Sequence, residues 1–442
     1  MRPLADAVEP ASSRRIAALA FPALGVLAAE PVYLLFDLAV IGRLGALSLA
    51  GLAIGALVMG VLSSQLTFLS YGTTARAARF FGAGDRRAAV EEGVQATWLA
   101  LGIGAAIVAA VQVTAVPLVS ALAAGGDIAD AALPWVRIAS LAVPAILIAA
   151  AGNGWMRGVQ DTVRPLRYVV VGFGLSALLC PVLVFGWFGA PELGLSGSAV
   201  ANVVGQWLAA LLFCRALFVE KVPLGVRPAV LRAQVVMGRD LILRTMAFQA
   251  CFISAGAVAA RFGAASVAAH QVVLQLWSFL ALVLDSLAIA AQSLVGAALG
   301  AGQLTHAKSV AWRVTIFSTV AGLVLAAVFA LGSSVIPSVF TTDRSVLDAI
   351  GVPWWFLVGI LPIAGIVFAV DGVLLGAGDA TFMRNATVAS ALLGFLPLIW
   401  LSLAYGWGLL GIWAGLAAFM VLRLIFVGWR ALSGRWLIPG TR

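Results

Sequence analysis

This sequence lacks charge above all. Charged residues make up 10% of its 442 residues, whereas a soluble domain carries roughly 25%. Hydrophobic residues make up 63%, and the mean hydropathy is +1.09. So little charge on so apolar a chain excludes a water-soluble globular protein and indicates a protein of the lipid bilayer.

Histidine and cysteine are also scarce. The two histidines, His270 and His306, form no cluster, and Cys180, Cys214 and Cys251 lie in apolar runs without the spacing of metal ligands. We also find no Ser/His/Asp grouping, no P-loop and no dinucleotide-binding glycine motif. The sequence therefore predicts a protein that is not an enzyme and that has neither a metal site nor an organic cofactor.

The net charge of +9 does not indicate a nucleic-acid partner, because the basic residues are scattered singly between apolar runs. With both termini in the cytoplasm, 23 of the 27 Lys and Arg residues fall in cytoplasmic loops, tails or helix ends. Only Arg43, Arg137, Arg261 and Arg344 fall elsewhere. Such asymmetry is typical of membrane topology. We therefore expect a multi-pass protein of a bacterial inner membrane with both termini cytoplasmic.

What the sequence does contain is a repeat at an offset of 218 residues. The string RLGALSLAG from Arg43 returns as RFGAASVAA from Arg261, and GWMRGVQDT from Gly154 returns as GVLLGAGDA from Gly372. A duplicated hydrophobic bundle is typical of transporters whose site lies between the halves.

Apolar runs long enough to cross a bilayer, about 20 residues each, occur twelve times. They predict an all-α integral membrane protein of two six-helix bundles, with an N-terminal lobe (1–219), a cytoplasmic linker (220–238) and a C-terminal lobe (239–442). The predicted spans are 16–42, 47–71, 92–118, 131–156, 166–188, 194–219, 239–262, 265–291, 309–334, 349–374, 384–405 and 408–432.

Four acids fall well inside these spans: Glu30, Asp37, Asp285 and Asp371. A charge at the bilayer centre costs about 2.5–3.5 kcal/mol, so each acid should be neutralised, paired or in contact with water. Asp37 follows Glu30 by two helical turns, so both lie on one face of the first helix. Because burial favours the neutral form of a carboxylate, Asp37 can hold either a proton or the charge of a cation. This competition is the simplest chemistry for antiport; the alternative is that each acid is a neutral structural group held by hydrogen bonds.

The two halves of the repeat do not share these acids. Asp37 corresponds to Ala255 in the second half, and Asp371 corresponds to Asn153 in the first. The N-terminal half therefore looks like the ion-coupling half, with Glu30 as a second coupling candidate.

Further polar and aromatic side chains within the spans are candidates to line a substrate cavity. Hydrogen bonding between helices is the alternative for the polar residues, and anchoring at the membrane interface is the alternative for tryptophan. Prolines in the first helix are candidate hinges. The cavity candidates are Asn153, Ser176, Asn202, Gln206, Trp135, Asp285 and Asp371, and the hinge candidates are Pro22 and Pro31.

Five strings occur in a characteristic order along the chain. In the first half, the Asp37 helix runs into IGRLGALSLAG, GWMRGVQDTVRP starts at Gly154, and GLSGSAVAN starts at Gly194. In the second half, RFGAASVAAHQ starts at Arg261 and LVGAALGAG starts at Leu294. Together these strings resemble the multidrug and toxic compound extrusion (MATE) family, and most of all its DinF branch.

The resemblance implies two six-helix lobes related by a pseudo-two-fold axis, a central V-shaped cavity, and alternating access. It also implies export of organic cations in exchange for protons or sodium. Asp37 matches the family's first-helix acid, Pro22 the proline where that helix bends, and Asn153 a polar residue of the cavity.

The chain departs from the family pattern at two positions. Several relatives carry an Asp before the fifth-helix proline, where this chain has Cys180 before Pro181. Members that bind sodium in the C-terminal lobe have a Glu early in the seventh helix, where this chain has Arg244. These departures favour protons over sodium as the coupling ion.

The sequence thus predicts a monomeric exporter of lipophilic organic cations, embedded in the bilayer and driven by protons. Three alternatives remain open: a sodium-coupled exporter, a flippase of lipid-linked precursors, and a non-transporting membrane scaffold. A flippase would favour a strongly basic cavity, which the N-terminal acids argue against.

Overall fold

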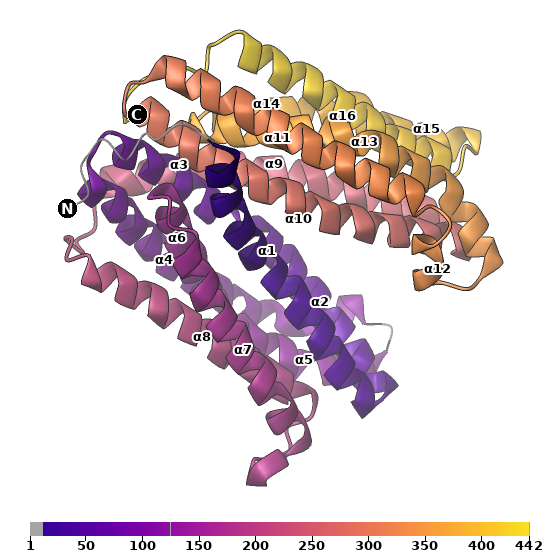
Figure 1. Cartoon of the computed structure of the whole chain (residues 1–442). Coiled ribbons are helices and arrows are strands. Elements are labelled where there is room, and N and C mark those ends of the chain that lie inside the picture. The colour runs from indigo at the N-terminus through magenta and orange to yellow at the C-terminus, as the bar shows by residue number, and fades with distance from the viewer. Residues whose placement is uncertain (1–11, 124, 442) are drawn as a thin grey trace. The chain divides into compact units, whose positions relative to one another are not determined.

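The computed structural model describes residues 12–123 and 125–441, and these residues form helices and no strands. Figure 1 follows the chain from α1 to α16. The first half contains α1 (Ser13–Ile41), η2 (Gly42–Leu44), α2 (Ala46–Leu66), α3 (Phe68–Gly82), α4 (Arg86–Leu122), α5 (Gly126–Ser140), α6 (Val143–Gly158), α7 (Val163–Phe185), η3 (Trp187–Gly189) and α8 (Leu195–Val219). The second half contains α9 (Pro228–Arg261), α10 (Ala264–Gly300), α11 (Leu304–Leu331), α12 (Ile336–Phe340), α13 (Arg344–Gly376), α14 (Ala380–Ser390), η4 (Ala391–Phe395), α15 (Leu396–Tyr405) and α16 (Leu409–Leu432).

Within these residues, eleven helical segments are long and apolar enough to cross a membrane. The pair α5 and α6, bent by 42° at its break, makes a twelfth when it is counted as one span. The all-helical membrane fold expected from the sequence is therefore confirmed.

The chain divides into two compact units. The N-terminal unit comprises Gly25–Phe81 and Asp85–Gly238, and the C-terminal unit comprises Arg239–Arg442 with Gly82–Gly84 and the first turns of α1 up to Leu24. The predicted lobes placed all of residues 1–219 together, whereas the contacts join the start of α1 to the C-terminal unit and join residues 220–238 to the N-terminal unit.

The repeated glycines mark turns that only glycine adopts readily. Gly45 and its counterpart Gly263 have φ of +110° and +98°, and each directly precedes a long helix, α2 or α10. Gly84 and Gly302, also 218 residues apart, have φ of +84° and +72°. A positive φ is sterically strained for an L-residue with a Cβ but not for glycine. The glycines repeated in the sequence therefore correspond to a repeated backbone geometry.

Proline accounts for the irregular helices. Pro144 lies in the first turn of α6, directly after the break that ends α5. The π-helical turn η4 directly precedes α15, which has Pro397 at its start and so lacks one amide donor. By contrast, α1 runs without interruption through Pro22 and Pro31.

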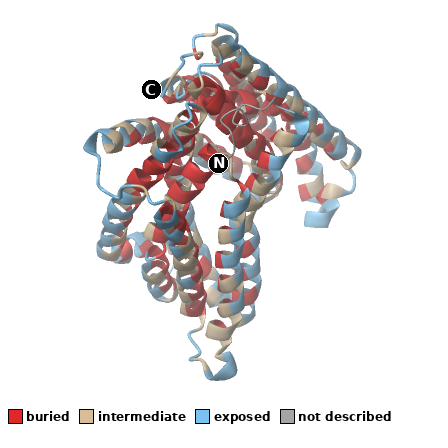
Figure 2. Cartoon of the chain, turned by 60° about the vertical axis from the view of Figure 1, so that its left-hand side comes forward, coloured by how far each residue is buried: buried red, intermediate tan, exposed pale blue. Residues whose placement is uncertain are grey.

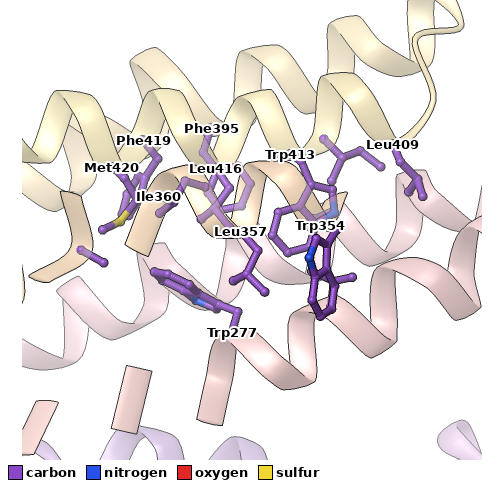
Figure 3. Packing of buried hydrophobic residues seen from close by; sticks show 14 of the residues in the cluster. Trp277, Trp354, Leu357, Ile360, Phe395, Leu409, Trp413, Leu416, Phe419 and Met420 are labelled. Carbon is purple, nitrogen blue, oxygen red and sulfur yellow. The ribbon is translucent and has the colours of Figure 1, made fainter. Parts of the chain in front are cut away.

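Buried residues lie along the facing sides of packed helices in each unit, while exposed residues lie on the outward sides and at the helix ends (Figure 2). Many outward side chains are large and apolar, such as Leu178 on α7 and Ile253 on α9, as expected for surfaces that face lipid. In the C-terminal unit, Trp277, Trp354, Trp413 and Phe419 belong to one buried cluster (Figure 3).

Candidate functional site

A cavity of about 190 Å³ lies within the N-terminal unit. Its walls come from α1, α2, α3, α6, α7 and α8, and half of the sixteen wall residues are polar or charged. The polar and charged wall residues are Glu30, Ser63, Thr67, Ser70, Tyr71, Asn153, Arg157 and Gln206.

Glu30 lies on α1, and its exposed side chain faces this cavity. Asn153 and Arg157 are one turn apart on α6, and both are buried. Arg157 donates a hydrogen bond to the hydroxyl of Ser70 at 3.3 Å, whereas the Oδ1 atom of Asn153 has no hydrogen-bond partner. The cavity therefore offers one acid, one base and an available amide oxygen.

Gln206 and Asn202 form a second polar pair on α8. The Nε2 atom of Gln206 donates to the Oδ1 atom of Asn202 at 3.5 Å, and Gln206 reaches the cavity wall. Asn202 is not a wall residue, so it acts on the cavity through Gln206.

Asp37 does not line this cavity; it is buried, with 3% of its surface exposed. Its Oδ1 atom accepts a hydrogen bond from the Cys180 thiol of α7 at 3.2 Å, and the Ser198 hydroxyl of α8 is a second hydrogen-bonding neighbour. Trp135 of α5 donates to Ser198 at 2.9 Å and so holds it in place. Asp37 thus sits among three helices, facing a thiol and a hydroxyl.

Asp37 differs from the other buried acids in its charge partners. Glu91, Glu92, Asp240 and Asp371 are buried, and each forms an ion pair with at least one arginine. Among the ion pairs of the described residues, none includes Asp37. A buried carboxylate without a basic partner is the kind that exchanges a proton readily.

Tyr33 lies one turn before Asp37 on the same helix and is also buried. Its ring packs against Phe173 at a centroid distance of 5.3 Å, and Phe173 lines the cavity. The Tyr33 hydroxyl has no hydrogen-bond partner. The aromatic ring of Tyr33 therefore lies on the same face of α1 as Glu30 at the cavity and the buried Asp37.

The structure places two other candidates away from this cavity. Ser176 is fully buried and donates to the carbonyl of Gly172 in its own helix, against Gly205 of α8. Asp285 is half-buried on α10 in the other unit, and it lines neither this cavity nor the one that contains Asp371.

The C-terminal unit contains a larger cavity of about 430 Å³, and Asp371 lies in its wall. Asp371 accepts hydrogen bonds from Arg244 at 2.8 Å and from Arg423. Arg423 was counted among the cytoplasmic basic residues, but its side chain is buried within this unit.

The two cavities occupy equivalent positions in the repeat. Six wall residues of the first lie 218 positions before six wall residues of the second. The pairs are Val26 and Arg244, Glu30 and Phe248, Ser63 and Ala281, Ala149 and Val367, Ala150 and Phe368, and Asn153 and Asp371.

Several residues of these sites were not singled out from the sequence, among them Arg157, Ser198 and Arg423. Arg157 follows Asn153 by four positions, which places both on one helix face. The helical spacing could therefore have predicted that Arg157 faces the cavity beside Asn153. Ser198 and Arg423 meet their partners 161 and 52 residues away in the chain. No local pattern reports contacts of that range.

Twelve spans in two units, each enclosing a partly polar cavity, define a multi-pass membrane transporter. A family model described as MatE matches residues 22–182 and 241–400. Protein DETOXIFICATION 44, chloroplastic, of Arabidopsis thaliana is 32% identical over 438 residues, which cover 95% of this chain and 83% of that protein. DNA damage-inducible protein F of Escherichia coli (strain K12) is 30% identical over 427 residues, which cover 92% of this chain and 90% of that protein.

This chain belongs to the MATE family, as its motifs led us to expect; members of that family are transporters of multiple drugs and toxic compounds, not enzymes. A solved MATE structure in the bent conformation matches with a TM-score of 0.87 at 22% identity, covering 96% of this chain and 95% of that one. At this identity the match shows the fold.

Proposed function

We propose that this protein exports lipophilic organic cations in exchange for protons, and that Asp37 carries the proton. The observation that supports Asp37 is its burial without an arginine or lysine partner, in a unit whose other buried acids are all ion-paired. Burial favours the protonated form of a carboxylate, while hydrogen bonds from Cys180 and Ser198 favour the ionised form. A carboxylate held between these opposing effects suits reversible proton exchange.

The neighbours of Asp37 also favour a proton over sodium. A sodium ion requires several oxygen ligands at once, whereas the thiol of Cys180 and the hydroxyl of Ser198 present hydrogen-bond donors to the carboxylate. Among the residues that the structure describes, no group of three or more His, Cys, Asp or Glu side chains is placed to hold a metal ion.

Glu30 is the residue we assign to substrate binding in this unit. Its carboxylate is the acid of a cavity wall in which eight of the sixteen residues are apolar, and there it attracts a cationic group. Seven residues of helix separate Glu30 from Asp37, about 10 Å along the axis. At an effective dielectric constant of about 20, two unit charges at that separation interact by about 1.6 kcal/mol.

This interaction couples the two ions. A cation beside Glu30 favours ionised Asp37 by about tenfold, and protonation of Asp37 weakens cation binding by the same factor, because linkage is reciprocal. A proton taken up from outside therefore promotes release of the substrate.

The distribution of Lys and Arg supports a cell-membrane location, a bacterial inner membrane, with both termini cytoplasmic. In this orientation the exporter takes its substrate from the cytoplasm. We propose that it acts as a monomer in the lipid bilayer.

The test is ethidium efflux from proteoliposomes under an imposed pH gradient, with sodium present and absent. We expect efflux to follow the pH gradient, to be independent of sodium, and to fall at least tenfold in Asp37→Asn. Asp343→Asn is the matched control, because Asp343 is exposed and asparagine also caps the start of α13. Efflux that needs sodium, or that survives in Asp37→Asn, contradicts the proposal.

A further inference from the structure

The cavity of the C-terminal unit differs in charge from that of the N-terminal unit. Its charged wall residues are Arg244, Asp371 and Arg423, two bases and one acid. In the repeat, Arg244 corresponds to Val26 of the other cavity, and Phe248 corresponds to Glu30. The first cavity has one acid and one base in its wall, Glu30 and Arg157, whereas the second has one more base than acids.

Asp371 does not satisfy all the hydrogen-bond donors of the two arginines. Both guanidinium groups donate to the same carboxylate oxygen, Oδ2. The Oδ1 atom of Asp371 and the Nε atoms of Arg244 and Arg423 are buried and have no hydrogen-bond partner. Arg423 is 1% exposed and Asp371 is 5% exposed, so this imbalance lies in the unit's interior. Uncompensated charge and unused donors in such a place are costly.

Aromatic rings fix the orientation of the two guanidinium groups. Arg244 lies over the ring of Phe248 at 5.7 Å, and Arg423 lies over the same ring at 5.3 Å and over Phe419 at 5.8 Å. Guanidinium groups over aromatic faces are stabilised by cation–π attraction and keep their edges free for hydrogen bonds. The donors are thus held in position before any ligand binds.

Apart from Gln249 and Ser278, the rest of the wall is apolar and aromatic. Trp277, Leu416, Phe419 and Met420 take part in it, and Figure 3 shows them in the same part of the unit. The volume of about 430 Å³ lies within the range of cavities that hold small organic molecules. An apolar chamber with excess positive charge suits a ligand with an aromatic body and an anionic head.

We propose that the cavity of the C-terminal unit is a binding site for amphipathic organic anions, with a carboxylate or sulfonate head held by Arg244 and Arg423. A planar carboxylate matches the fork of an arginine in two parallel hydrogen bonds. Asp371 then competes with the ligand for the same donors and holds the two arginines in place when the site is empty.

Equilibrium dialysis of tritiated 2-naphthoate against the full chain in phosphatidylcholine nanodiscs tests this site. We expect naphthoate to bind about tenfold or more tightly than 2-naphthamide, which has the same rings without the charge. Acetate, which has the charge without the rings, should compete only weakly. Equal binding of naphthoate and naphthamide would contradict recognition of the anionic head by the arginines. Strong competition by acetate would contradict recognition of the aromatic body by the apolar wall.

Three variants locate the binding site. Arg244→Gln and Arg423→Gln should each weaken naphthoate binding about tenfold or more, whereas Asp371→Asn should strengthen it by removing the competing carboxylate. A structural role for the cluster predicts the opposite result for Asp371→Asn. Arg244 is partly exposed, so its variant remains informative if Arg423→Gln does not fold.

Arg430→Gln is the matched control. Arg430 lies on the same helix as Arg423, also pairs with an aspartate, and also lies over a phenylalanine ring, but it is not in the cavity wall. Its variant should bind naphthoate as the wild type does; loss of binding in Arg430→Gln together with unchanged binding in Arg244→Gln overturns the assignment. The assay imposes no pH gradient and measures only naphthoate binding, so its failure is distinguishable from failure of the ethidium efflux test of proton coupling.

Discussion

Cys180 is the residue whose chemistry most directly affects Asp37. Its thiol is a weak hydrogen-bond donor to the carboxylate of Asp37. Cys180→Ser replaces the thiol by a stronger hydroxyl donor of similar size. The hydroxyl stabilises ionised Asp37, so the carboxylate gains its proton only at lower pH. The pH of half-maximal ethidium efflux should move toward acid by about half a unit to one unit.

The control for this substitution is Cys214→Ser. Cys214 is half-buried on α8 and is not the thiol that hydrogen-bonds to Asp37, so its variant should keep the wild-type pH profile. A profile that does not move in Cys180→Ser, or that moves equally in both variants, shows that the thiol does not act on the coupling carboxylate.

Asp37 could be predicted from the sequence because an acid inside an apolar run is costly wherever the helix packs. Its surroundings could not, since Ser198 and Cys180 approach it only through the packing of α7 and α8 against α1. Arg423 lies within the predicted span 408–432, and a count of basic residues on each side of the membrane does not show whether one side chain is buried. Its burial depends on Asp371 in another helix, and an isolated span gives no signal of that contact.

Helices α7 and α8 pack through glycine. A Cβ atom at Gly205 would overlap the Ser176 hydroxyl and the backbone of Gly172. Gly205→Ala therefore forces the two helices apart, which should destabilise the protein by about 1–3 kcal/mol. The measurement is the thermal unfolding midpoint in detergent.

Gly174→Ala is the control, because a Cβ at Gly174 meets nothing within 4 Å. Its unfolding midpoint should equal that of the wild type or rise slightly, since alanine is the better helix former. Equal loss of stability in both variants, or no loss in Gly205→Ala, would mean that the close packing at Gly205 does not determine the effect.

The segment between α8 and α9 was expected to act as a linker, and the structure holds its middle against α4. Gln95 donates to the carbonyl of Gly225 at 2.7 Å and accepts from the amide of Arg227 at 2.7 Å, while Trp98 donates to Leu224 at 2.8 Å. Gln95→Ala removes two of these bonds. Trypsin should then cut after Lys221 several-fold faster in the purified protein, as followed by gel electrophoresis.

Gln112→Ala is the matched control on the same helix, because Gln112 bonds to Arg137 and Ser140 and not to the linker. Its cleavage rate should equal that of the wild type. Unchanged cleavage in Gln95→Ala would mean that this side chain does not restrain the segment.

The helices themselves could be predicted closely because hydropathy alone defines their cores. The predicted span 131–156 is nevertheless two helices, α5 and α6, since hydropathy does not report a break in the hydrogen-bond ladder. The predicted span 92–118 extends to Arg86–Leu122, because a helix continues past its apolar core into charged turns.

At the scale of the whole molecule, the proposed topology places Ser433 in the cytoplasm and Ser334 on the opposite side. Both serines are exposed, and two of the three native cysteines are buried. In intact spheroplasts, an impermeant maleimide should label Ser334→Cys and not Ser433→Cys, and lysis should make both reactive. The reverse pattern would mean that the chain is inserted the other way.

The proton count on substrate binding is the measurement that tests the central claim most directly. The purified protein in nanodiscs is placed in weakly buffered solution and saturated with tetraphenylphosphonium, a cation that has no proton to give. We predict release of up to one proton per bound cation from the wild type and none from Asp37→Asn, with cation binding confirmed for both. Equal proton release from the two proteins would contradict Asp37 as the coupling residue.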